Sequence, residues 1–523
     1  MLLQRIGNRG IQLGTLFERA AARHPANILI LDHDLDIAPG MGRRATIPEV
    51  ADLVDDMAAR LWAARVRPAD RVAVYKSNGF DITLLALACA RIGAQPMLLS
   101  PYLKETSAAE LVHRAGRPFL ITDAAKLDRL PREVFEGVER VILTSGQRDG
   151  ALTLAELAGA PRVPAVTMPP GHPTLITHTS GTTGVPKLAV HTSRTLQARY
   201  RPQAIAAAGI LPRRETVAIH VSFVHSRLMT ALAISLLRGF PIAVLADSSP
   251  DLAANLFARI RPGVLEAHPN SLMEWERLAD DPRRPLASVK LFSATFDAVH
   301  PRTVGRLLGA SQRRMPIFGQ LYGQSEVGPI VACAFSRRRV PKAAGRCVGR
   351  PFPGMTAIRV VSRNGAPPSA ANPGYIEVRS DGRIVTYLGE QQRYDDQLSA
   401  DGWWRMGDVG YRTERGCFHL LDREVDMIEG FGSTLAAEDV LFSRLDDLAE
   451  VVIVPDQNGT AVPVVCTRDD SPLDLESWRA AAASLPPMAD PVQWRIEDLP
   501  QTATTKVKRL SLARAVTERQ QGA

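Results

Sequence analysis

The sequence lacks the long apolar runs that mark membrane and secreted proteins. Its longest ones, near 83–90 and 229–237, each stop at an arginine, well short of the about 18 residues that a membrane span needs. The N-terminal segment has no apolar stretch followed by a small-residue cleavage site. We therefore expect no membrane span and a cytoplasmic protein.

Cysteine is scarce as well. Five cysteines are scattered over 523 residues, and none forms a C-x-x-C pair. This pattern disfavours both a disulfide framework and a zinc knuckle. We expect Cys89, Cys333, Cys347, Cys417 and Cys466 to be ordinary buried thiols.

Aromatic residues make up only 6% of the chain, and no internal repeat is visible. The net charge of +8, from 63 basic and 55 acidic residues, favours anionic partners in general. Because the basic pairs are scattered without interleaved aromatics, the pattern disfavours nucleic-acid binding and leaves nucleotides and coenzymes as possible partners.

Lysine is rare among the basic residues. The chain has eight lysines, so arginine supplies the other 63 − 8 = 55. Arginine does not replace lysine as a compact, rotatable point charge. A lysine inside a candidate motif is therefore less easily read as background basicity.

Alternating helical and strand patterns are what the sequence does contain. Apolar residues recur at helical spacing over 13–23, 50–65, 82–92 and 107–115, and β-rich runs occupy 71–75, 96–99, 119–122 and 140–143. This alternation predicts an α/β fold with mostly parallel sheets.

The composition changes past residue 345. There, many Gly and Pro residues and alternating segments such as 375–379 predict small antiparallel β structure. The last hundred residues carry their own helices at 437–445 and 473–483 and a strand at 450–454. We predict a large N-terminal domain of α/β subdomains (1–421) with a β-rich part at about 345–421. A hinge (422–426) would join it to a small, mobile C-terminal α+β domain (427–523).

One loop has the composition of a phosphate site. Residues 177–187 read T-H-T-S-G-T-T-G-V-P-K and directly follow a strand-like segment. Two glycines let the backbone curl into an anion-binding nest, the hydroxyls add donors, and the lysine adds a full charge. The spacing is not that of a Walker loop. The alternative is a flexible Ser/Thr/Gly surface linker.

This loop closely resembles the phosphate-binding signature of the adenylate-forming (ANL) superfamily, which includes acyl-CoA synthetases, adenylation domains of peptide synthetases and beetle luciferases. Other matches follow in the family's order across essentially the whole chain. Residues 321–326 (L-Y-G-Q-S-E) resemble the adenine and magnesium segment, 404–408 (W-R-M-G-D) the ribose segment, and 499–509 the C-terminal lysine motif.

The resemblance implies roles that suit the chemistry of these residue types. ATP activation of a carboxylate places an anionic nucleophile beside a polyanion, so positive charge is needed on both sides. The implied catalytic residues are Lys506, His225 and Glu326, with Glu326 also the magnesium ligand. The implied nucleotide-binding and coenzyme-binding residues are Thr179, Ser180, Gly181, Thr182, Thr183, Gly184, Lys187, Tyr322, Gly323, Gln324, Ser325, Asp408, Arg423 and Gly432.

Within that set, Tyr322 would stack on adenine, Asp408 would bind the ribose hydroxyls, and Arg423 would reach the ribose or a phosphate. Lys506 would bridge the substrate carboxylate and the α-phosphate. Gly432 matches the glycine beside which a pantetheine arm threads.

Three positions and one segment depart from the family pattern. Val425 stands at the usual polar hinge position, Thr505 replaces the glycine before the C-terminal lysine, and Ala437 replaces a proline. Residues 293–297 (S-A-T-F-D) replace a glycine-rich turn. These departures bear on domain rotation, adenylation and the pocket, and they keep open a variant in which one half-reaction is weak or lost.

The family's acyl pocket maps to 222–227, the stretch near 268–270, and 294–296. Val224 stands where an acid would hold an α-amino group, which disfavours a free amino acid and leaves aryl, fatty or other bulky acids. Arg227 would face a second polar group of the substrate or lie exposed. His225 matches a family histidine near the acyl and thiol paths.

The resulting hypothesis is ATP- and Mg²⁺-dependent activation of a carboxylic acid to an acyl-adenylate, followed by thioester formation with coenzyme A. One alternative is loading of a carrier protein's pantetheine, or a single half-reaction completed by a partner adenylating enzyme. Another, of a different class, is a non-catalytic nucleotide-binding scaffold.

Overall fold

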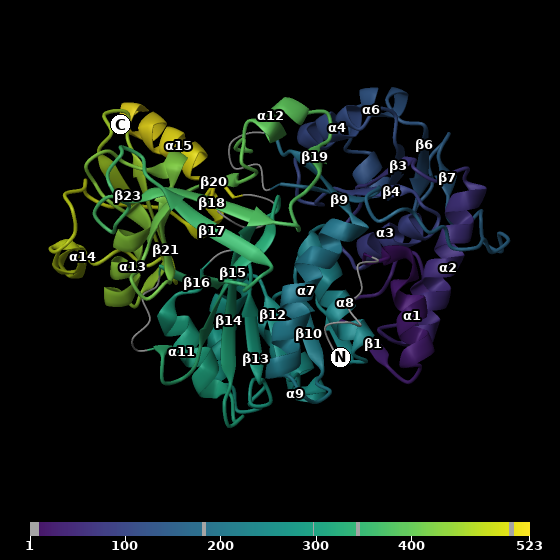
Figure 1. Cartoon of the computed structure of the whole chain (residues 1–523), viewed down its shortest axis with the longest axis horizontal. Coiled ribbons are helices and arrows are strands. Elements are labelled where there is room, and N and C mark those ends of the chain that lie inside the picture. The colour runs from purple at the N-terminus through teal and green to yellow at the C-terminus, as the bar shows by residue number, and fades with distance from the viewer. Residues whose placement is uncertain (1–9, 180–184, 297, 341–345, 502–506, 523) are drawn as a thin grey trace.

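The structure is a computed structural model that describes residues 10–179, 185–296, 298–340, 346–501 and 507–522 (Figure 1). Three sheets and the helices packed against them make up this part of the chain. The first sheet is continuous through 13 strands and the second through eight, while the third is small and belongs to the C-terminal segment.

The 13-stranded sheet is parallel from β1 through β14 in space and antiparallel beyond it and at its β2 edge. In spatial order its strands are β17 (Thr356–Val361), β18 (Gly374–Ser380), β20 (Trp404–Arg412), β21 (Phe418–Arg423), β16 (Cys347–Pro351), β15 (Gly328–Phe335), β14 (Ile317–Gln324), β13 (Leu291–Ala294), β12 (Val264–Ala267), β10 (Val217–His220), β11 (Ile242–Val244), β1 (Ile28–Leu31) and β2 (Arg44–Thr46).

The eight-stranded sheet is parallel except at β9 and β19. Its strands are β19 (Thr386–Tyr387), β9 (Leu188–Thr192), β8 (Pro173–His178), β4 (Gln95–Leu98), β3 (Arg71–Val74), β5 (Phe119–Thr122), β6 (Arg140–Leu143) and β7 (Leu152–Thr153). The small sheet contains β22 (Leu448–Pro455), β23 (Ala461–Thr467) and β24 (Val492–Gln493).

Fifteen α-helices occur in the described ranges. They are α1 (Leu16–Arg23), α2 (Ile47–Ala63), α3 (Asp81–Arg91), α4 (Glu105–Arg114), α5 (Ala124–Leu127), α6 (Glu133–Glu136), α7 (Ser193–Ile210), α8 (Ser226–Leu237), α9 (Pro250–Ile260), α10 (Pro269–Glu274), α11 (Pro301–Ala310), α12 (Gln391–Asp395), α13 (Thr434–Arg444), α14 (Leu475–Ala482) and α15 (Arg509–Gly522). None of the described helices is long and apolar enough to cross a membrane.

Helix α2 shows how local sequence fixes an element. Thr46 and Glu49 form a reciprocal capping box, and a proline occupies the first turn. Buried residues Val50, Val54 and Met57 follow at helical spacing and face the core. The predicted helix at 50–65 is confirmed, with its start three residues earlier at the cap.

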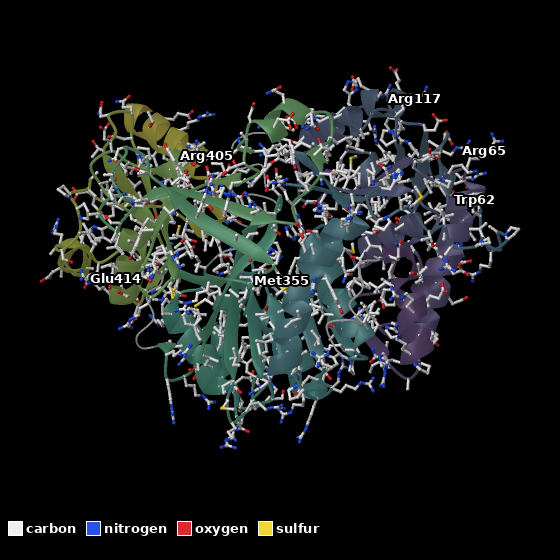
Figure 2. The ribbon with its side chains drawn as sticks, viewed as in Figure 1. Trp62, Arg65, Arg117, Met355, Arg405 and Glu414 are labelled. Atoms are coloured by element: carbon white, nitrogen blue, oxygen red, sulfur yellow. The ribbon has the colours of Figure 1, made fainter. Side chains whose placement is uncertain are left out.

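One hydrophobic core joins the two large sheets. It contains residues of α1, α2, α3 and α8 together with Val72 and Val74 of β3 and Ile219 and Ile242 of the 13-stranded sheet. Helix α3 is buried along most of its length, and its sequence is accordingly a nearly continuous apolar run. Charged side chains such as Arg65, Arg117 and Glu414 are exposed (Figure 2).

The α/β fold predicted from the alternation is confirmed, and β5 and β6 match their predicted residues. The cysteine prediction is correct for Cys89 and Cys466 but wrong for Cys333, Cys347 and Cys417, which are half-buried. Those three lie in or beside antiparallel strands of the 13-stranded sheet, whose pairing leaves alternate side chains partly exposed.

The predicted hinge falls between two well-formed elements. Strand β21 ends at Arg423, and a 3₁₀ turn over Glu424–Asp426 leads to the C-terminal segment. That segment contacts the larger body through ion pairs of Arg346 with Asp439 and of Arg302 with Asp446. The domain boundaries and the mobility of the C-terminal domain stay predictions.

Candidate active site

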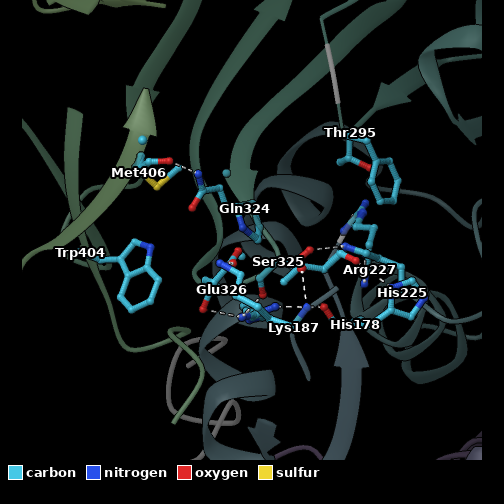
Figure 3. Close-up of a pocket in the computed structure, with 18 of the residues that line it drawn as sticks. His178, Lys187, His225, Arg227, Thr295, Gln324, Ser325, Glu326, Trp404 and Met406 are labelled. Atoms are coloured by element: carbon cyan, nitrogen blue, oxygen red, sulfur yellow. Dashed lines mark hydrogen bonds and ion pairs between the residues drawn. The ribbon is translucent and has the colours of Figure 1, made fainter. Parts of the chain in front are cut away.

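A cavity of about 300 Å³, the main cavity, lies where the two large sheets meet α8. Its wall gathers segments that are far apart in the sequence (Figure 3). The lining residues that matter below are Thr179, Lys187, Arg199, His225, Arg227, Thr230, Thr295, Phe296, Gln324, Ser325, Glu326, Tyr387, Arg423 and Val425.

The predicted phosphate loop connects β8 and β9, which pair as an antiparallel hairpin. Its two ends are held together: the Lys187 backbone N–H donates to Thr179 Oγ1 at 3.1 Å, and the Thr179 N–H donates to the Lys187 carbonyl at 2.9 Å. Ser180, Gly181, Thr182, Thr183 and Gly184 lie outside the described residues. Thr179 and Lys187, at the two described ends of the predicted loop, both line the main cavity.

Lys187 and Glu326 meet through a tyrosine that the sequence did not indicate. Tyr387 donates its hydroxyl to Glu326 Oε1 at 2.6 Å, and Lys187 Nζ lies 3.0 Å from that hydroxyl and 3.5 Å from Oε1. Burial, and then the Glu326 charge, raise the pKa of Tyr387, so it remains a donor. The three groups form one network between the phosphate loop and the predicted magnesium ligand.

Replacing this bridging tyrosine gives a testable prediction. Tyr387→Phe removes the hydroxyl and leaves a buried carboxylate oxygen short of a donor, which costs about 1 to 3 kcal/mol. We expect kcat/KM for ATP to fall about 5- to 150-fold in steady-state assays of pyrophosphate release.

Tyr394→Phe is the matched control. Tyr394 belongs to the same aromatic cluster, 6.1 Å from Tyr387, but its hydroxyl donates to the Ile384 carbonyl instead. The two variants should unfold at similar temperatures, while kcat/KM for ATP falls only in Tyr387→Phe. Equal losses of activity in both variants would mean that Tyr387 acts through core packing and not through its hydroxyl.

Glu326 fits a magnesium ion only in partnership with a nucleotide. Among the described residues there is no group of three or more metal-ligating side chains. Magnesium in phosphoryl sites is commonly held by one or two carboxylates plus phosphate oxygens. Glu326, buried and beside Lys187, matches that donor set, and the bound ion would supply charge neutralisation at the phosphates.

Arg199 of α7 is hydrogen-bonded to the backbone of the segment that carries Glu326. This arginine is 3% exposed and donates to the carbonyls of Ser325 and Glu326 at 2.9 and 3.0 Å. It also bonds the Gly382 carbonyl and the Ser226 hydroxyl. Burial lowers its pKa to about 9, so the buried group still carries a charge at neutral pH. Arg199 is a positioning residue for Glu326.

The predicted nucleoside residues converge through strand register. Tyr322, near the end of β14, donates its hydroxyl to Asp408 Oδ2 at 2.6 Å. Asp408 on β20 lies opposite Arg423 on β21, whose Nε is 3.6 Å from Oδ1. Gln324 donates to the Met406 carbonyl. These residues, with Gly323, line the main cavity or the second cavity beside it.

His225 lies at the N-cap of α8, where Nδ1 accepts the N–H of Arg227 at 3.1 Å. Its Nε2 is 3.4 Å from Ser325 Oγ. Burial, and then the charge of Arg199, lower the pKa of His225 to about 3. The imidazole is therefore neutral at physiological pH, and it offers a hydrogen-bonding edge rather than a cation.

Phe296 occupies the atypical segment noted in the sequence. Its φ of 87° lies in the region that favours glycine, which costs about 1 to 3 kcal/mol for other residues. The ring packs 4.6 Å from both the His225 and the His268 ring centroids. The predicted bulk in this turn is thus placed in the cavity wall, where it narrows the space for a substrate.

The second cavity, of about 330 Å³, lies between the larger body and the C-terminal segment. It shares Phe296, Gln324, Arg423 and Val425 with the main cavity, and Val507 lines it from the C-terminal side. Lys506 lies outside the described residues, next to Val507. Gly432, with φ of 88°, is exposed and lines neither cavity.

The AMP-binding enzyme family matches residues 17–388. The chain is also 47% identical, over 98% of its length and 97% of the relative's, to 3-amino-2-hydroxy-4-methoxybenzoate diazotase of Streptomyces cremeus. The chain therefore belongs to the AMP-binding enzymes, the adenylate-forming ANL superfamily.

Two further comparisons find similar proteins. A 2-hydroxy-7-methoxy-5-methyl-1-naphthoate–CoA ligase of Streptomyces carzinostaticus is 26% identical, with 82% of this chain and 79% of the relative covered. The o-succinylbenzoate coenzyme A synthetase of Bacillus subtilis, solved with ATP and magnesium ion, shares the fold. Its TM-score is 0.76 at 20% identity, over 95% of this chain and 99% of that one.

Proposed function

We propose that this chain is an ATP-dependent diazotase that converts an aryl amine bearing a carboxylate into its diazo form. The observation that carries the proposal is the 47% identity, over nearly the whole of both chains, to a diazotase of an aminohydroxybenzoate. Membership of an adenylate-forming family supplies the other half: an oxyanion is activated by ATP before the second substrate attacks.

The oxyanion follows from the product. Diazotisation adds one nitrogen at the oxidation level of a nitroso group, and the anion at that level is nitrite, whose O–N=O mimics the O–C=O of a carboxylate. A nitrite oxygen attacks the α-phosphorus, the bond to the β-phosphate oxygen breaks, and pyrophosphate leaves. The adenylate formed carries an O–N=O group in place of an acyl group.

The second step joins the two nitrogens. The amine attacks the nitroso nitrogen, AMP leaves with the bridging oxygen, and a proton is lost, which gives an N-nitroso arylamine. Its N=N–OH tautomer loses hydroxide, which a proton converts to water, and the diazonium remains. No external oxidant is needed, because the nitrite nitrogen is reduced while the amine nitrogen is oxidised.

The residues of the site suit both steps. Lys187 and the loop around it would hold the departing pyrophosphate, and Glu326 would hold a magnesium ion that neutralises phosphate charge. Asp408 and Arg423 would hold the ribose, and Lys506 would bridge nitrite and the α-phosphate.

The part of the main cavity around His225 suits a neutral amine. Only an unprotonated amine is a nucleophile, and a site for it needs no carboxylate counter-ion. His225 is neutral, and the position before it is Val224, not an acid. Both features support an arylamine and disfavour an α-ammonium group.

The test combines the enzyme with ATP, Mg²⁺, nitrite and 3-amino-2-hydroxybenzoate. We expect pyrophosphate release that requires nitrite, and a diazo product that couples to a phenol to give a coloured azo compound. Release that instead requires coenzyme A and proceeds without nitrite would refute the proposal.

Thioester formation with coenzyme A is the second candidate, favoured by similarity to the naphthoate–CoA ligase and by Gly432 in the expected sequence context. Gly432→Leu should block thioester formation, since the family resemblance implies that the pantetheine arm passes beside this glycine, while acid-dependent pyrophosphate exchange continues. Loading of a carrier protein, or cooperation with a partner adenylating enzyme, stays a prediction.

Gly430→Leu is the control for that variant. Gly430 also has positive φ, 75°, and a Cβ there would likewise meet no atom within 4 Å. Both variants therefore introduce similar backbone strain two residues apart. Equal loss of thioester formation in both, or equal loss of both half-reactions in Gly432→Leu, would remove Gly432 from the thiol path.

A further inference from the structure

An arginine in the wall of the main cavity is fixed with one edge free to meet a substrate. Arg227 lies on the first turn of α8, and its side chain is 9% exposed. Both Glu266 oxygens, from β12, accept from it: Oε1 is 2.5 Å from Nε and Oε2 is 2.6 Å from Nη2. This two-point pairing sets the plane of the guanidinium.

The remaining guanidinium nitrogen, Nη1, makes only one long contact within the described part of the chain. Its contact is Thr230 Oγ1 at 3.5 Å, which is long for a hydrogen bond. The Thr230 hydroxyl is itself donated to the Arg227 carbonyl at 2.8 Å. Arg227 and Thr230 both line the main cavity, so Nη1 has donors available there.

A second buried polar group points to a ligand at the same end. Thr295 is 7% exposed, lines the main cavity, and its Oγ1 has no hydrogen-bond partner among the described residues. It follows β13, whose Ser293 is paired with Glu266. Figure 3 shows Thr295, His225 and Arg227 on the side of the cavity away from Trp404. A buried hydroxyl left unpaired costs free energy unless a bound molecule satisfies it.

We propose that Arg227 Nη1 binds the carboxylate that the aryl substrate keeps through the reaction, and that Thr295 Oγ1 bonds a polar ring substituent such as a hydroxyl. This inference rests on the proposed function, because only a reaction at the amine leaves the carboxylate free. In ligation to coenzyme A that carboxylate must lie at the α-phosphate instead.

The Arg227–Glu266 pair is neutral as a whole, so its recognition of an anion depends on the N–H groups of Nη1. A substrate carboxylate that joins it makes a charge-assisted hydrogen bond to a guanidinium already oriented by its partner. The neutral His225 beside it adds no competing charge. The site therefore selects aminoarenes that carry a carboxylate over simple aminophenols.

The experiment compares 3-amino-2-hydroxybenzoate with 2-aminophenol, which lacks only the carboxylate, in nitrite-dependent azo-coupling assays. We expect the wild-type enzyme to favour the acid by about 10- to 100-fold in kcat/KM. Arg227→Gln should erase that preference, mainly through KM for the acid, while nitrite-dependent pyrophosphate exchange without amine stays within a few-fold of wild type.

Two variants guard against misfolding. Arg227→Gln leaves Glu266 as a buried, unpaired carboxylate, so the double variant Arg227→Gln/Glu266→Gln repeats the test with that charge removed. Arg238→Gln, at the C-cap of α8 and lining neither cavity, is the matched arginine control and should keep the preference.

The outcomes separate the two proposals. If the wild type diazotises both amines equally well, or if the Gln variants keep the preference, the role of Arg227 is wrong and the diazotase proposal stands. A parallel loss of amine-free exchange in both Gln variants would show that the Arg227–Glu266 pair has a structural role rather than a role in substrate recognition. If no amine yields a diazo product, the proposed function itself fails.

Discussion

Lys506→Ala is expected to slow adenylate formation by about 10²- to 10³-fold, the loss typical when one group that stabilises transition-state charge is removed. Lys506 precedes Val507, which pairs with Gln501 in an isolated bridge and lines the second cavity. The second cavity shares Phe296, Gln324, Arg423 and Val425 with the main one. We propose that Lys506, which lies outside the described residues, serves the α-phosphate, and nitrite-dependent pyrophosphate exchange measures its effect.

Lys508→Ala is the matched control for this prediction. It removes the same charge two residues further on, where the backbone N–H bonds the Pro500 carbonyl and the residue lines neither cavity. We expect near wild-type exchange from it. Exchange by Lys506→Ala above a tenth of the wild-type rate, or equal loss in both variants, would contradict the assignment.

Glu326→Gln is expected to have the second-largest effect, about 10²-fold or more on the first half-reaction. The amide keeps the shape and can still accept from Tyr387, but it removes the negative charge that a magnesium ion needs. We expect the Mg²⁺ concentration for half-maximal activity to rise strongly. The half-saturation point is read from magnesium titrations of pyrophosphate release.

Glu390→Gln serves as the control for that titration. Glu390 pairs with Arg114 and Arg393 and does not line the main cavity. Its neutralisation should leave the magnesium requirement unchanged. An unchanged requirement in Glu326→Gln as well would show that the ion, if bound, is held by other groups.

The fold was largely predictable because its signals are local. Strands β5 and β6 are short, continuous apolar runs between polar turns, as expected of strands buried on both faces. Helix starts were less well placed: α2 begins at a capping box that lies before its apolar pattern. The half-burial of Cys333 depends on which strands pair, and no local pattern reports that.

The site was predictable only where a motif carried it. Tyr322, Asp408 and Arg423 come from separate motifs, and the pairing of β20 with β21 brings the last two together. The sequence did not predict Arg199 and Tyr387 as site residues. One arginine among 55, and one tyrosine 200 residues from Lys187, belong to no recognisable motif. Their roles come from tertiary contacts alone.

The chemistry of the second substrate was also beyond the motifs. Carboxylate and nitrite present the same kind of oxygen to the α-phosphorus, so one set of phosphate, ribose and lysine motifs serves both. We propose that the choice between them depends on the shape and hydrogen bonding of the cavity wall around Phe296, His225 and Arg227. Sequence motifs therefore indicated ligation to coenzyme A, whereas the full-length relative points to an amine acceptor.

The most direct test follows one oxygen atom. With nitrite labelled by oxygen-18 in both positions, ATP, Mg²⁺ and 3-amino-2-hydroxybenzoate, mass spectrometry should find one labelled oxygen in the AMP released, because the nitrite oxygen on phosphorus stays when the amine attacks nitrogen. Unlabelled AMP from nitrite, together with labelled AMP when the carboxylate of the arene carries the isotope, would contradict the account.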